Sequence, residues 1–176
     1  IHQALFVIAH IIVLVTCGLN YSGTIAYVAV ISSMLSILLC MRWDIEILTN
    51  NDGKLLKNLI IASILIIATT SFSLLINRFL GTILQNVIIL SACFIAFHEL
   101  FVTILFVRNK IYTYSAFRCL PALILVLSAV SGIQPEFAWL FSFLTSTIFL
   151  TWYLRAMLLD SLSSINKLII KEIKLI

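Results

Sequence analysis

The chain has 176 residues, of which 62% are hydrophobic and 10% are charged, and its mean hydropathy is +1.19. These values exclude an ordinary soluble domain and predict an integral membrane protein, which is surrounded by lipid. The net charge of +4 does not indicate a nucleic-acid partner, because the basic residues lie between apolar runs and form no stripe.

Six apolar runs follow one another along the chain. Runs this long and without alternation predict helices, since a bilayer core requires every backbone group to be satisfied internally. Turn residues lie between the runs, including Asn20–Gly23, Asn50–Gly53 and Ser131–Pro135. The six expected spans, which we predict to be sequential antiparallel neighbours, are Ala4–Gly18, Thr24–Met41, Leu55–Ile76, Thr82–Val107, Ser115–Val130 and Phe137–Tyr153.

Basic residues fall on alternate connections. Ten of the eleven flank the second and fourth connections or follow the last span, whereas Arg78 alone lies at the opposite end. Short loops rich in Lys and Arg stay in the cytoplasm, so we predict that both chain termini are cytoplasmic. Residues 1–158 are therefore expected to form one six-helix transmembrane lobe.

The segment 159–176 has a different pattern. Leu162, Ile165, Leu168, Ile169, Ile173 and Ile176 recur at helical spacing, and Lys167, Lys171 and Lys174 fall on another face. This pattern is typical of an amphipathic helix in the membrane interface, with lysines toward anionic headgroups. A solvated helix end and a linker to a further lobe are the alternatives.

Ionisable side chains far from the ends of the expected spans need an explanation, because charge is costly there. His98 and Glu99 lie in the middle third of the fourth span, and His10 lies in the first. Glu99 shares a helical face with Ala92, Ala96 and Thr103, a row of small residues that permits close approach of another helix. We expect these groups either to line a polar cavity or to form hydrogen bonds that fix the packing of neighbouring helices.

One short motif resembles a known family. The second span ends in Arg42-Trp43-Asp44, with Glu46 close behind, and is followed by a polar connection. This resembles the polysaccharide flippases of the multidrug/oligosaccharidyl-lipid/polysaccharide superfamily, whose second helix ends in an Arg-aromatic-acidic signature. The basic stretch from Arg108 to Arg118 is similar to that family's connection between helices four and five.

The resemblance implies a transporter and no enzyme. It implies a bacterial inner-membrane flippase lobe that moves a polyprenyl-pyrophosphate-linked oligosaccharide by alternating access, facing a second six-helix lobe, with no cofactor. Because guanidinium groups match phosphate oxygens, the expected headgroup ligands are arginines near helix ends, namely Arg42, Arg118, Arg155 and, at the opposite end, Arg78. Simple anchoring of helices at the interface is the alternative for each arginine.

Two other functions stay open from the residues alone. A non-catalytic membrane subunit fits the composition equally well, while a membrane-embedded enzyme would need a clustered site. Paired aspartate motifs, a Ser with a His, and His-rich metal motifs are not found in the sequence, so we predict no catalytic and no metal-ligating residues. The expected acidic residues are missing from the first connection, and Ile1 in place of Met favours a fragment over a half-size transporter.

Overall fold

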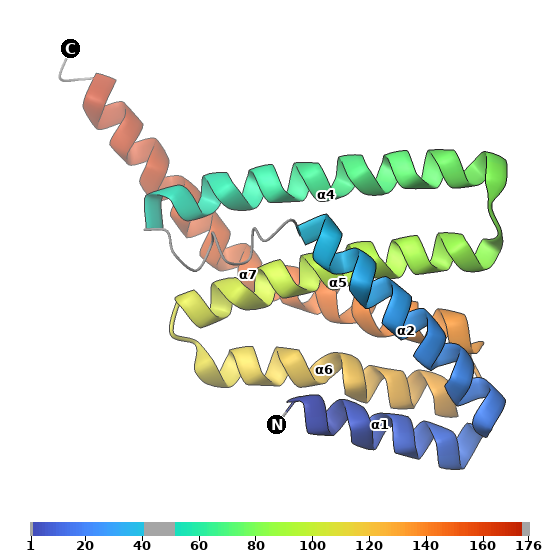
Figure 1. The fold of residues 1–176 in the computed structure, drawn as a ribbon. Coiled ribbons are helices and arrows are strands. Elements are labelled where there is room, and N and C mark those ends of the chain that lie inside the picture. Colours follow the sequence, from blue (N-terminus) through green and yellow to red (C-terminus); the bar gives the residue numbers. More distant parts are fainter. Residues whose placement is uncertain (1, 41–51, 174–176) are drawn as a thin grey trace.

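The computed structural model describes the backbone of residues 2–40 and 52–173 and the side chains of residues 4–40, 58–78 and 81–155. Within these ranges all the regular elements are helices, which confirms the all-α part of the predicted fold class (Figure 1). The helices are α1 (His2–Cys17), α2 (Leu19–Cys40), α4 (Asp52–Leu80), α5 (Ile83–Val107), α6 (Ile111–Val130) and α7 (Pro135–Ile173).

Five of these helices, α2 and α4 to α7, are long and apolar enough to cross a bilayer, and α1 carries a shorter apolar stretch, Ala4–Cys17. Large apolar side chains also cover the outer surface, for example Val15, Leu38 and Trp152, which are at least two-thirds exposed. A monomer in water does not expose so large an apolar surface, whereas the acyl chains of a bilayer cover such a surface favourably. The chain is therefore a multi-pass membrane protein.

The first turn differs from the predicted one. Asn20–Gly23 is helical and belongs to the first turns of α2, so the prediction of a connection there was wrong. The chain reverses instead at Gly18, whose φ of 88° lies in the left-handed region that suits glycine. A single residue between α1 and α2 makes the sharp corner that Figure 1 shows.

The later turns follow the predicted signals more closely. Thr82 caps α5 with a capping box completed by Gln85, and Gly132 has a φ of 76° between α6 and Pro135, the first residue of α7. Two boundaries differ by about one turn: α4 ends at Leu80 instead of Ile76, and α6 begins at Ile111 instead of Ser115. The connection after α2 lies outside the described residues.

Helix α5 lies at the centre of the bundle and packs against α2, α4, α6 and α7. Of the helices described, it is the most buried of the candidate spans. The α4–α5, α5–α6 and α6–α7 pairs are antiparallel neighbours, as predicted, and α1 packs mainly on α6, far from it in sequence (Figure 1). Helix α2 crosses this layer obliquely and contacts both α5 and α7.

Helix α7 continues without a break to Ile173, so the predicted boundary at residue 158 falls inside one helix. Its 39 residues give a length of about 58 Å, nearly twice a hydrocarbon core of about 30 Å. In Figure 1 its far end projects past the other helices. The lysines and apolar side chains of the predicted interfacial segment lie outside the described side chains.

Candidate functional site

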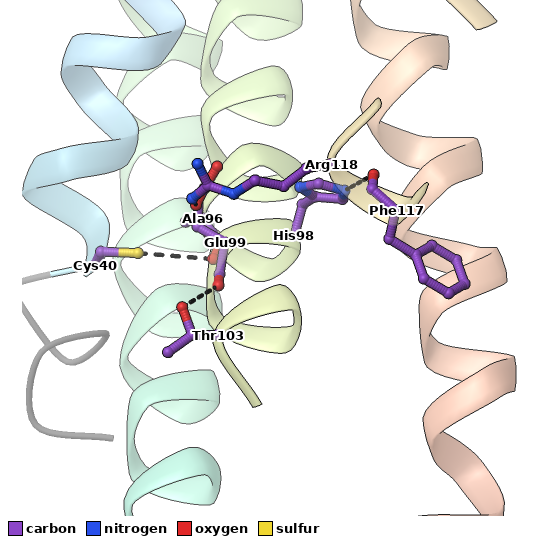
Figure 2. A network of polar contacts seen from close by, with 7 residues as sticks. All are labelled: Cys40, Ala96, His98, Glu99, Thr103, Phe117 and Arg118. Carbon is purple, nitrogen blue, oxygen red and sulfur yellow. Dashed lines mark hydrogen bonds and ion pairs between the residues drawn. The ribbon is translucent and has the colours of Figure 1, made fainter. Parts of the chain in front are cut away.

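An ion pair joins α5 to α6 within the membrane-spanning region. Arg118 Nη2 donates to Glu99 Oε2 at 2.5 Å, and the two side chains are 24% and 39% exposed (Figure 2). Glu99 lies eight residues before the end of α5 at Val107, which is about 12 Å along the helix axis. A carboxylate and a guanidinium at this depth offset one another's cost of leaving water.

This pairing revises the interpretation of Arg118. The sequence placed it at a helix end as a ligand for a lipid headgroup, but it is the eighth residue of α6 and its cation also lies 5.3 Å from the centroid of the Tyr114 ring. The earlier start of α6 moves it one turn deeper than expected. Its principal described partner is thus a carboxylate of the same chain.

His98 faces a different neighbour from Glu99. Its side chain is 2% exposed, its Nε2 donates to the Phe117 carbonyl oxygen at 3.2 Å, and its ring meets Phe143 of α7 edge-on at 5.6 Å. The Phe117 carbonyl would normally accept the N–H of residue 121, which is Pro121 and has none. His98 therefore replaces a missing helical hydrogen bond, which fits the packing alternative for this residue.

A cavity of about 620 Å³ lies between α1, α2, α5 and α7. Each helix contributes side chains three or four residues apart, which share one helical face. Glu99 lines the cavity from α5, and its partner Arg118 is not among the lining residues. The lining residues are Phe6, His10, Ser33, Ser36, Ile37, Cys40, Ile95, Glu99, Trp139 and Phe143.

The row of small residues on α5 permits close helix contact, as predicted. Ala92 and Ala96 are fully buried, and Cys40 Sγ at the end of α2 donates to the Ala96 carbonyl at 3.6 Å (Figure 2). Thr103 Oγ1 donates to the Glu99 carbonyl of its own helix at 2.8 Å. Helix α2 thus approaches α5 one turn from Glu99 and closes that side of the cavity.

The other predicted site residues separate into three groups. His10 lines the same cavity as Glu99, and its Nδ1 lies 2.9 Å from the Phe6 carbonyl. Arg78 and Arg155 are exposed near the ends of the α4 and α7 spans and do not line this cavity. Arg42 lies outside the described residues, together with Trp43, Asp44 and Glu46.

Several cavity residues were missed by the sequence reasoning. Trp139, Phe143 and Phe6 looked like ordinary apolar residues, and Ser33 and Ser36 like ordinary hydroxyl groups of a membrane helix. A signal for the ion pair was present: Glu99 lies nine residues before Arg108 and Arg118 lies nine residues after Asn109. In a tight helical hairpin, equal separations from the turn place two residues at the same depth.

The cavity combines a carboxylate, hydroxyl groups and aromatic rings at membrane depth, a set suited to reversible binding of a polar molecule. Among the described side chains, no three His, Cys, Asp or Glu residues come together as metal ligands would. No protein-family model, no curated protein and no solved structure matches this chain.

Proposed function

We propose that this chain is one lobe of a membrane transporter that moves a polyprenyl-pyrophosphate-linked oligosaccharide from the inner to the outer leaflet of the bacterial plasma membrane. The observation that carries the proposal is the cavity between the spans with the ionisable Glu99 in its wall. An ionisable group that faces a cavity inside a membrane span marks a pathway for a polar solute.

The chemistry of the lining supports a glycan as the solute. Sugar hydroxyls donate hydrogen bonds to carboxylate and serine oxygens, and the apolar faces of sugar rings pack against aromatic rings such as Trp139. The Arg42-Trp43-Asp44 motif supports the same substrate class through its resemblance to the flippases. A second lobe, facing this one, completes the transport path in this proposal.

Transport can be measured with the protein purified from its native membrane and reconstituted in vesicles with a lipid-linked oligosaccharide. A glycosidase added outside reports how much glycan reaches the outer leaflet. Glu99→Gln should slow this movement about tenfold, since a hydrogen bond to a charged group contributes about 1.5–3 kcal/mol.

Glu136→Gln is the matched control, because it makes the same chemical change in the first turn of α7 and Glu136 does not line the cavity. It should transport at the unsubstituted rate. Equal rates for Glu99→Gln and Glu136→Gln, at equal amounts of folded protein, would rule out the cavity as the transport path.

A further inference from the structure

A groove of about 350 Å³ lies on the outer surface between α6 and α7, separate from the cavity. The two helices are antiparallel neighbours (Figure 1), and the rings of Phe117 and Tyr153 lie 5.6 Å apart between centroids. The first half of α6 therefore meets the end of the α7 span at one depth in the membrane. The groove shares no lining residue with the cavity that contains Glu99. Its lining residues are Ala116, Phe117, Leu120, Phe149, Trp152 and Tyr153.

The groove faces the lipid. Trp152 is 74% exposed, Phe149 is 53% exposed and Tyr153 is 40% exposed, so the described part of the chain leaves these rings uncovered. In a membrane-spanning chain such a surface contacts acyl chains. A concave apolar surface touches a chain on more than one side, and it therefore holds that chain better than the convex surface of a single helix does.

Basic side chains lie at the end of the groove that is nearer the membrane surface. Arg155 follows Trp152 by three residues and is the last residue of the α7 span. Lys110 precedes Phe117 by seven residues, about two helical turns, and is the residue just before α6. Both basic side chains are exposed, and among the described side chains neither forms an ion pair with a carboxylate. Their charges are thus available at the depth where lipid phosphates lie.

This order of groups matches an anionic phospholipid. The phosphate of such a lipid lies at the membrane surface, beside Lys110 and Arg155, and one acyl chain runs from there past Trp152 and Phe149 toward the bilayer centre. Phosphatidylcholine has the same chains, but its choline group cancels the phosphate charge, so charge complementarity favours a headgroup with a net negative charge. The transported lipid is a poorer match, because its sugar would lie in the cavity, which is lined by other residues.

We infer that the groove between α6 and α7 is a binding site for one anionic phospholipid of the surrounding bilayer. Arg155 and Lys110 contact its phosphate, and the aromatic residues of the groove hold one acyl chain. This site is distinct from the cavity, and the inference does not depend on the proposed transport function.

Trp152 provides a direct readout of the bound lipid. The full chain with Trp43→Phe and Trp139→Phe retains Trp152 as its only tryptophan. It is placed in nanodiscs that mix phosphatidylglycerol with phosphatidylcholine, with bromine on the acyl chains of one lipid at a time, because bromine quenches a nearby indole. Phosphatidylglycerol should be preferred about fivefold at Trp152, a difference of about 1 kcal/mol. Equal quenching by the two lipids, or no quenching by either, overturns the inference.

Two substitutions separate the charge from the groove. Arg155→Gln should reduce the preference to about twofold, because one of the two positive charges is lost. Arg78→Gln is the matched control: it makes the same change near the end of the α4 span and should leave the fivefold preference unchanged. Ala116→Phe fills the groove, keeps both charges and should also reduce the preference to about twofold. A fivefold preference that survives Ala116→Phe would show that basic charge alone attracts the lipid, and it would overturn the groove as the site.

Native mass spectrometry of the chain with all its tryptophans tests the same site without the two Trp→Phe substitutions. The unsubstituted chain should retain phosphatidylglycerol over phosphatidylcholine, and Arg155→Gln should retain it less; equal retention by both proteins overturns the inference. A polyprenyl phosphate at the same mole fraction should compete no better than phosphatidylglycerol. Stronger competition would assign the groove to the transported lipid and overturn the inference. Vesicle transport decides the proposed function separately, since loss of Glu99-dependent transport says nothing about lipid preference at Trp152.

Discussion

His98 and Pro121 act on the same backbone atom: the histidine Nε2 donates to the Phe117 carbonyl oxygen, whose usual partner, the N–H of residue 121, proline lacks. His98→Leu should therefore lower the free energy of unfolding by about 1–2 kcal/mol, as expected for an interhelical hydrogen bond lost inside a membrane. Pro121→Ala restores the missing N–H. The loss caused by His98→Leu should be clearly smaller in the Pro121→Ala background, measured by denaturation in mixed micelles; an equal loss in both backgrounds would contradict this role.

Removing one member of the Glu99–Arg118 pair should cost more than removing both. Arg118→Gln leaves a carboxylate at membrane depth without its guanidinium partner, and we expect a loss of about 1–3 kcal/mol, below the about 3–5 kcal/mol of a fully buried pair. The double variant Glu99→Gln with Arg118→Gln should recover part of that loss. Unfolding free energies of the four proteins form a double-mutant cycle, and strictly additive losses would show that the two side chains do not interact.

Replacing Gly18 should destabilise the protein through backbone strain alone, without steric crowding by the new side chain. A Cβ at Gly18 would meet nothing within 4 Å, but its φ of 88° disfavours any other residue by about 1–2 kcal/mol. Gly18→Ala should lower the thermal unfolding midpoint in detergent. Gly23→Ala is the control, because Gly23 is helical, has open space around its Cα and should gain slightly in helix propensity. Equal midpoints for the two variants would contradict the strain argument.

Membrane orientation is testable by labelling in intact cells. Tyr112, at the start of α6, is exposed at the end of the bundle that also holds the N-terminus, whereas Ser131 is exposed at the opposite end (Figure 1). With the four native cysteines replaced by alanine, Ser131→Cys should react with a membrane-impermeant maleimide, and Tyr112→Cys should react only after lysis. The reverse pattern would refute cytoplasmic termini.

The helices were predictable because, inside a bilayer, the backbone must satisfy its hydrogen bonds internally, and a long apolar run does so as a helix. Long apolar runs gave five spans and the shorter α1 with small boundary errors, and Gly132 and Pro135 gave the α6–α7 turn. The error at Asn20–Gly23 has a physical reason: polar residues near a membrane surface are tolerated in a helix as readily as in a turn. At Gly18 the lack of a Cβ, and not polarity, determined where the chain reversed.

The site was predictable only as a set of candidates. Sequence identified His98 and Glu99 as unusual, but two adjacent residues on one helix point in directions about 100° apart. Which neighbour each meets depends on how α5 packs against α2, α6 and α7. Glu99 thus lines the cavity and pairs with Arg118, while His98 donates a hydrogen bond to the Phe117 carbonyl. The aromatic residues of the cavity could not be identified from the sequence. Trp139 and Phe143 look like other apolar residues of a span, and only their neighbours in the folded structure place them at the cavity.

The continuity of α7 has a mechanical consequence. Trp139 and Phe143 lie near its beginning, and the same uninterrupted helix reaches Ile173, about 45 Å beyond Phe143. An α-helix without a break behaves as a stiff rod over such a distance. If α7 tilts by about 10° at the cavity, its far end moves by about 8 Å. Any tilt of α7 near Trp139 and Phe143 would therefore produce a larger displacement at Ile173 than at the cavity.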